Sequence, residues 1–123
     1  MVKNWDIIRA ILLRLESSET ANTTLNSNDI PGYPEQEVAY NMRLLNEAGF
    51  IAANILDSNT GGGRIAAALA RRLTNSGHEL LDTMRADSVW GKVKDTFKTK
   101  GVEMSFELVI AVGKRVAESL LFS

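Results

Sequence analysis

Three consecutive glycines, Gly61 to Gly63, constrain the fold of this chain more than any other feature of its sequence. Glycine adopts backbone conformations that other residues rarely adopt, so such a run indicates a place where the chain reverses direction. Residues 50–56 before it are apolar enough to form a strand, and residues 57–60 are polar turn formers. A reversal here would lay residues 64–73 beside 50–56 as a β-hairpin.

The stretch 64–73 is compatible with two structures. Its alanines favour a helix, because alanine has the highest helix propensity. Its alternation favours a strand, with one face formed by Ile65, Ala67, Leu69 and Leu73. We favour the strand, because Thr74 suits the start of a helix better than its middle. The sequence therefore predicts a two-stranded hairpin with a glycine-rich tip.

The rest of the chain has a mostly helical pattern. Apolar residues recur every three or four positions in five segments: 4–15, 35–48, 74–85, 87–100 and 103–121. Asn4 is expected to cap the first helix, and Thr74 or Ser76 the third. A short strand is expected at 23–25. We therefore predict an α+β, mostly helical fold with one two-stranded hairpin and two additional C-terminal helices.

The length of 123 residues fits a single domain, 1–123, with a core of about 1–86 and a helical extension of about 87–123. The chain has no cysteine, which excludes disulfides and cysteine-ligated metals. Charged residues interrupt its apolar beginning: Asp6, Arg9 and Arg14. We therefore expect no signal peptide. No apolar run approaches the ~20 residues of a membrane span, so we expect a cytoplasmic protein that does not enter a membrane.

The order of these elements resembles the winged-helix plan, in which a helix is followed by a hairpin called the wing. Two phrases carry this resemblance. The first is Leu-Leu-Asn-Glu-Ala-Gly-Phe-Ile at 44–51, where a helix ends and enters the wing. The second is Arg-Leu-Thr-Asn-Ser-Gly-His-Glu-Leu-Leu-Asp at 72–82, where the wing runs into a helix. The resemblance implies a winged-helix-like fold.

More narrowly, the chain resembles an uncharacterised domain-of-unknown-function family of bacteria, prophages and phages. The matching residues lie along nearly the whole chain: Trp5 to Arg9, Gly32-Tyr33, Glu37 to Tyr40, the two phrases above, Val89-Trp90 and Ser105 to Glu107. The chain departs from the family at Asn41, where the resemblance predicts histidine, and in the alanine-rich segment 65–70. The resemblance implies no assigned activity and supplies no catalytic residues.

His78 is the single histidine and the natural place to look for catalysis. A histidine base needs a nucleophile and an orienting acid. Ser76, Glu79 and Asp82 are close in sequence, but Ser76 and Glu79 have the spacing of a helix cap. We therefore expect His78 to be structural, with no catalytic residues, no metal site and no enzyme activity. Gly61 to Gly63 lack the Lys-Ser/Thr ending of a phosphate-binding loop, so we expect no cofactor.

Basic residues nevertheless gather in ways that suggest duplex DNA, although the net charge is −1. The predicted second strand carries three arginines and no acid: Arg64, Arg71 and Arg72. Arginines on a wing can contact phosphates or the minor groove. The helix 35–48 offers side chains that can read base edges: Gln36, Tyr40, Asn41 and Arg43. Its acids, Glu35, Glu37 and Glu47, oppose this use because phosphate contacts supply much of the affinity for DNA.

A second basic cluster falls in the segment 87–100: Lys92, Lys94, Lys98 and Lys100. We interpret it as a solvated helix face. The apolar faces of 87–100 and 103–121 either close the core of the monomer, which we favour, or form a homodimer. We therefore expect a phage- or prophage-type DNA-associated regulator. The alternative is a protein-interaction module that binds a host or phage protein and no DNA.

Overall fold

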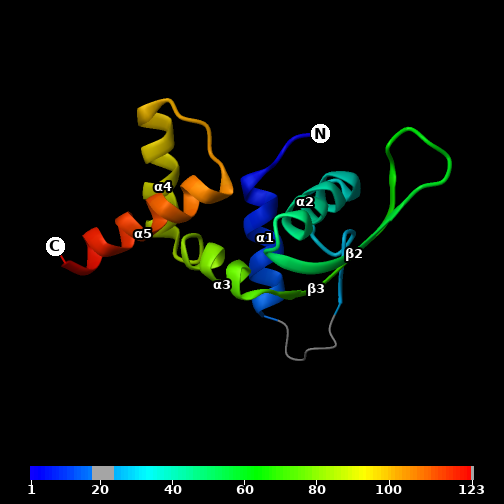
Figure 1. Cartoon of the computed structure of the whole chain (residues 1–123), viewed down its shortest axis with the longest axis horizontal. Helices are drawn as coiled ribbons and strands as arrows, with labels where there is room; N and C mark the ends of the chain where they lie inside the picture. Colours follow the sequence, from blue (N-terminus) through cyan, green and yellow to red (C-terminus); the bar gives the residue numbers. More distant parts are fainter. Residues whose placement is uncertain (18–23, 123) are drawn as a thin grey trace. The chain divides into compact units, whose positions relative to one another are not determined.

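The computed structural model describes residues 1–17 and 24–122. Figure 1 shows the mixed α+β structure that they form. Its elements are α1 (Trp5–Glu16), β1 (Leu25–Asn26), α2 (Glu35–Glu47), β2 (Ile51–Asp57), β3 (Ile65–Leu73), α3 (Asn75–Asp82), α4 (Asp87–Lys100) and α5 (Phe106–Phe122). The predicted α+β class is confirmed, and the order is compatible with a winged-helix-like arrangement. The hairpin is also confirmed, because 65–73 is a strand.

Two compact units divide the chain, Met1–Gly77 and His78–Ser123. The division falls inside α3, N-terminal to the expected boundary near 86. The expected strand at 23–25 is found at Leu25–Asn26 instead, and Thr23 lies outside the described residues.

The first unit contains a three-stranded antiparallel sheet in the order β1-β3-β2. We call β2, β3 and their connection, residues 51–73, the wing. Gly61, Gly62 and Gly63 all have positive φ, between 71° and 81°. Residues with a β-carbon rarely adopt this backbone conformation. The Ser58 N–H donates to the Arg64 carbonyl at 2.9 Å and closes the base of this tip. Figure 1 shows the tip as an open loop that extends away from α2.

The pairing of β2 with β3 has two irregularities. Its register passes from Ala52↔Arg72 to Ala53↔Ala70, and from Leu56↔Ala67 to Asp57↔Ile65, so Ala66 and Arg71 are extra residues on β3. Each such bulge resets the alternation of side chains between the two faces. The predicted buried face of β3 is therefore wrong in part. Its buried residues are Ile65, Ala68, Ala70 and Leu73, whereas Ala67 and Leu69 are half-buried.

The core of the first unit lies among α1, α2 and the sheet. α1 contacts both α2 and β3, and α2 contacts both wing strands. The side chains buried on the two helices include Ile7, Ile8, Ile11, Leu12, Val38, Met42 and Leu45. Asn4 caps α1 as predicted, since its Oδ1 accepts from the backbone N–H groups of Asp6 at 3.0 Å and Ile7 at 3.2 Å. Most apolar residues that recur every three or four positions on α1 and α2 are thus buried, as their spacing predicts.

Thr74 joins β3 to α3 and fixes the junction to the start of the wing. Its N–H donates to the Phe50 carbonyl at 3.0 Å, and its hydroxyl donates to the Gly49 carbonyl at 2.5 Å. The same hydroxyl accepts from the Gly77 N–H at 3.1 Å, which makes Thr74 the N-cap of α3. Gly77 lies so close to Phe50 that a β-carbon there would overlap the Phe50 carbonyl oxygen. No residue larger than glycine therefore fits at position 77 without moving the backbone of Phe50.

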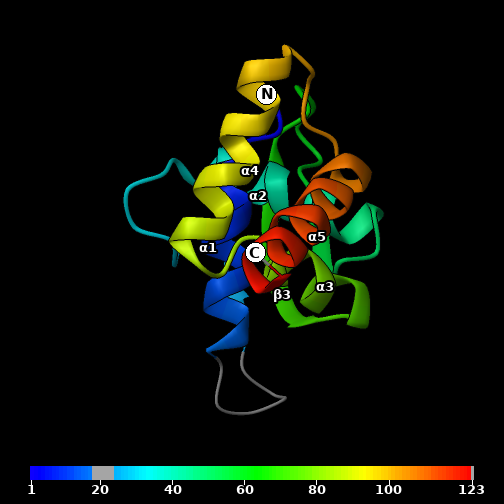
Figure 2. The same cartoon turned by 90° about the vertical axis from the view of Figure 1, so that its left-hand side faces the viewer.

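In the second unit, α4 and α5 contact each other, and Figure 2 shows them crossing obliquely. α4 buries Trp90, Val93 and Phe97 and ends at Gly101, which is left-handed. α3 is shorter than predicted, because it ends at Asp82 and the chain turns there. In this turn the Thr83 and Met84 N–H groups donate to carbonyls only three residues earlier.

Gly77→Ala is expected to destabilise the protein by at least about 2 kcal/mol, because a backbone carbonyl cannot move aside for the added methyl group. Gly91→Ala is the matched control, since a β-carbon there meets no described atom within 4 Å. It should stabilise α4 by up to ~1 kcal/mol. Urea unfolding midpoints of the two variants measure both effects. Equal stabilities would contradict the packing of Gly77 against Phe50.

Candidate nucleic-acid interface

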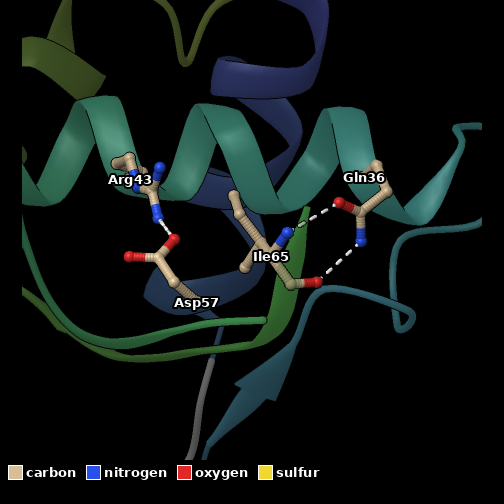
Figure 3. Close-up of polar contacts among 4 residues, drawn as sticks. All are labelled: Gln36, Arg43, Asp57 and Ile65. Atoms are coloured by element: carbon tan, nitrogen blue, oxygen red, sulfur yellow. Dashed lines mark hydrogen bonds and ion pairs between the residues drawn. The ribbon is translucent and has the colours of Figure 1, made fainter. Parts of the chain in front are cut away.

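Gln36, from the first turn of α2, binds the backbone of β3 where the strand begins. Its Nε2 donates to the Ile65 carbonyl at 2.8 Å, and its Oε1 accepts from the Ile65 N–H at 3.0 Å (Figure 3). The side-chain amide therefore pairs with Ile65 much as a neighbouring strand would. Both hydrogen-bonding groups of Gln36 are in use, so α2 holds the wing just after its glycine tip.

Two further side chains of α2 hold β2. Arg43 forms an ion pair with Asp57 at the end of that strand (Figure 3). Asn46 Oδ1 accepts from the Ala53 N–H at 3.0 Å. Because Gln36 and Arg43 lie two helical turns apart, the helix is attached to the wing along most of its length. Two of the four α2 residues predicted to read base edges, Gln36 and Arg43, thus help to fix the hairpin to its helix.

Asn41 lies inside the protein, and the prediction that it faces a DNA groove is wrong. Its side chain is 0% exposed. Its Oδ1 accepts from the Asn4 N–H at 2.9 Å, and its Nδ2 donates to the Glu37 carbonyl at 2.8 Å. Position 41 lies on the same buried face of the helix as Val38, Met42 and Leu45. This helical spacing indicates from the sequence that Asn41 is buried. Tyr40, the fourth candidate on α2, is half-buried.

The exposed part of α2 is mainly acidic. Glu35, Glu37 and Glu47 are exposed, whereas Gln36 and Arg43 are half-buried and already bonded. The helix therefore presents carboxylates where a recognition helix would present hydrogen-bond donors. An approaching polyanion would be repelled by this surface.

The wing carries the basic part of the candidate interface. Arg64, Arg71 and Arg72 are all exposed. Neighbouring residues of a regular strand point to opposite faces, but the bulge at Arg71 breaks this rule and leaves Arg71 and Arg72 both exposed. Arg71 donates weakly to Asn54 Oδ1 at 3.5 Å, and Arg72 to the Leu73 carbonyl at 3.3 Å. A guanidinium has five N–H donors, so each retains donors for a ligand.

Charge within the wing favours an anionic ligand. In residues 51–73 the single acid in the sequence is Asp57, and its carboxylate is paired with Arg43. The three exposed arginines therefore lie in a hairpin whose single acid is already paired with Arg43. Backbone phosphates are ligands that such arginines bind well.

His78 is exposed on α3. Among the described residues, no group of three or more histidine, aspartate or glutamate side chains is arranged to hold a metal ion. None of the described helices is both long and apolar enough to span a membrane.

The fold and this interface define a small α+β domain with a basic hairpin fastened to an acidic helix. The chain belongs to the family described as "Hypothetical protein (DUF2513)", which it matches over residues 2–103. It is also similar to an uncharacterized protein of Haemophilus influenzae, with 37% identity over 121 residues that cover 98% of this chain and 99% of that protein. No solved structure matches the chain. The resemblance to a family of unknown function is thus confirmed.

Gln36→Ala is expected to release the Ile65 amide, because the variant loses both hydrogen bonds to β3. Losing about 1–2 kcal/mol of local stability should speed hydrogen exchange at Ile65 by about 5- to 30-fold. Asn46→Ala is the matched control and should release the Ala53 amide while Ile65 stays protected. Equal acceleration at both amides in either variant would contradict separate attachment of the two wing strands.

Proposed function

We propose that this protein is a DNA-associated regulator of phage or prophage type that contacts duplex DNA through the wing. The observation that supports this most is the pair Arg71 and Arg72, which a bulge leaves exposed side by side on β3. Together with Arg64 they offer three guanidinium groups to phosphates or to a narrow minor groove. The resemblance to prophage and phage proteins supports the biological setting.

The role proposed for α2 differs from that of a usual recognition helix. Gln36 and Arg43 hold the wing and Asn41 is buried, so Tyr40 is the remaining candidate on α2 for a contact with DNA. The exposed acids of α2 disfavour deep entry into a groove. We therefore infer that α2 positions the wing, and that recognition depends on the DNA backbone and groove shape more than on base edges.

The alternative function is a protein-interaction module without DNA binding. The exposed carboxylates Glu35, Glu37 and Glu47 favour it, because they suit a basic protein surface better than a nucleic acid. Co-purification of a specific host or phage protein, lost when these residues are changed to glutamine, would support the alternative. In both cases we propose a cytoplasmic binding protein without catalytic activity or cofactor.

Substituting Arg71 and Arg72 together by alanine is expected to weaken duplex binding across all sequences. Three phosphate contacts predict that log affinity falls with log salt with a slope of about −2.7, and one remaining contact predicts about −0.9. Fluorescence anisotropy with mixed-sequence duplex DNA over a salt series measures both slopes. The proposal fails if the wild-type chain binds no duplex at low salt.

Lys94→Ala with Lys98→Ala is the matched control, because it removes the same charge from exposed lysines of α4. The control should leave the salt slope nearly unchanged, since those lysines lie outside the wing. If the control and the arginine variant lose affinity equally, binding reflects general charge and the wing has no special part in it.

A further inference from the structure

A groove of about 720 Å³ lies between α4 and α5, inside the second unit. Its α4 wall runs from Lys92 to Lys100 and its α5 wall from Ala111 to Ser119. Each wall therefore extends for about 12 Å along its helix. Figure 2 shows the two helices that form these walls. A groove of this length matches about two turns of a third helix.

The charge of the groove is mainly positive. Lys92 and Lys100 lie at the two ends of the α4 wall, and Arg115 lies on the α5 wall. Among the described residues that line the groove, the single acid is Asp95 of α4. All four of these residues are exposed. The groove thus favours a partner that carries acids.

The α5 wall supplies the apolar part of the groove. Ala111, Val112 and Val116 line it, and the two valines are half-buried. The α4 wall, in contrast, presents lysine, threonine and aspartate. An occupant that fits both walls has apolar side chains on one face and acids on the flank beside α4. An amphipathic acidic helix has this pattern, and amphipathic helices commonly bind in grooves of partner proteins.

Both walls are held in place by packing on their other faces. α4 buries Trp90, Val93 and Phe97, none of which lines the groove. On α5, Gly113 lies so close to Thr83 that a β-carbon there would overlap the Thr83 side chain. Because rotation of either helix would break this packing, the groove residues stay on the outside. A preformed groove of this kind costs less free energy to fill than one that must first open.

The acidic helices of this chain fit the groove poorly. α2 exposes three glutamates, but most of its apolar residues are buried. α5 exposes Glu107 and Glu118. It also exposes Lys114 and Arg115, which a basic groove would repel. Duplex DNA fits poorly as well, because phosphates lose hydration against the apolar wall.

We propose that the groove between α4 and α5 binds an acidic amphipathic helix of another protein. The apolar ridge of that helix packs on Val112 and Val116, and its acids pair with Lys92 and Lys100. Because these lysines lie about 12 Å apart along α4 with Asp95 between them, the partner helix has acids two turns apart and none midway. The site uses no residue of the wing, so it does not rest on the proposed DNA binding.

A synthetic peptide with this pattern tests the proposal on the full chain. It is a helix of about 18 residues with a leucine ridge and two glutamates two turns apart on one flank. Nuclear magnetic resonance of the isotope-labelled protein should show the peptide shifting amides of 92–100 and 111–119. Replacing both glutamates by lysine should weaken binding by about tenfold or more. Replacing the leucines by glutamine should abolish binding, and moving one glutamate midway, opposite Asp95, should weaken it.

Lys92→Glu with Lys100→Glu should weaken binding of the acidic peptide by about tenfold or more and create binding of the lysine peptide. Lys94→Glu with Lys98→Glu is the matched control, because it makes the same charge change at exposed α4 residues that do not line the groove. Each pair includes one lysine of the last turn of α4, so effects on helix stability are balanced, and circular dichroism checks them. Asp95→Asn should tighten binding by about two- to fivefold.

The wing provides the competing outcome, since its arginines also attract acids. Arg71→Ala with Arg72→Ala should leave binding of the peptide unchanged. The proposal is overturned if the peptide does not bind, if it shifts amides of the wing instead, or if the two lysine reversals weaken it equally. Displacement of the peptide from 92–100 and 111–119 by mixed-sequence duplex DNA would also overturn it. A chain that binds the peptide there but no duplex would support this site and remove the proposed DNA binding.

Discussion

The pairing of β3 along both of its edges is the interaction on which the first unit depends. β1 binds one edge and β2 the other, and Gln36 of α2 binds the backbone where β3 begins. At its other end, Thr74 returns to the Phe50 carbonyl and starts α3. If the alanine-rich segment 65–73 formed a helix, as its local propensity favours, all of these contacts would be lost. Long-range pairing therefore decides the structure here against local preference.

Much of this fold could be predicted because its determinants are local. Asn4 and Thr74 are side chains that cap helices, and the glycine tip follows from backbone sterics. The buried face of β3 could not be predicted in full, since the bulges at Ala66 and Arg71 depend on how two strands meet. The bulge at Arg71 leaves Arg71 and Arg72 both exposed. The sequence shows that these two arginines are adjacent, but it does not show that both side chains are exposed.

The polar residues of α2 show a second limit of sequence interpretation. Gln36, Asn41 and Arg43 are residue types that read bases, and in this protein each is bound to backbone or side chain of the same chain. A pattern of residue types describes chemical capability, whereas only the fold decides whether that capability is directed inward. The buried stripe that includes Asn41 was visible in the spacing, but the pairing of Gln36 with Ile65 required the position of β3.

The glycine tip separates two kinds of constraint that usually occur together. Around Gly61, Gly62 and Gly63 an added β-carbon meets no described atom within 4 Å, yet all three residues have φ values that disfavour L-amino acids. An L-amino acid is therefore disfavoured at these positions by the positive φ, and not by a clash with neighbouring atoms. A mirror-image residue such as D-alanine, introduced by chemical synthesis, would occupy this region of φ naturally and would reduce the freedom of the unfolded chain. The tip of the wing could in this way be stiffened without touching the rest of the molecule.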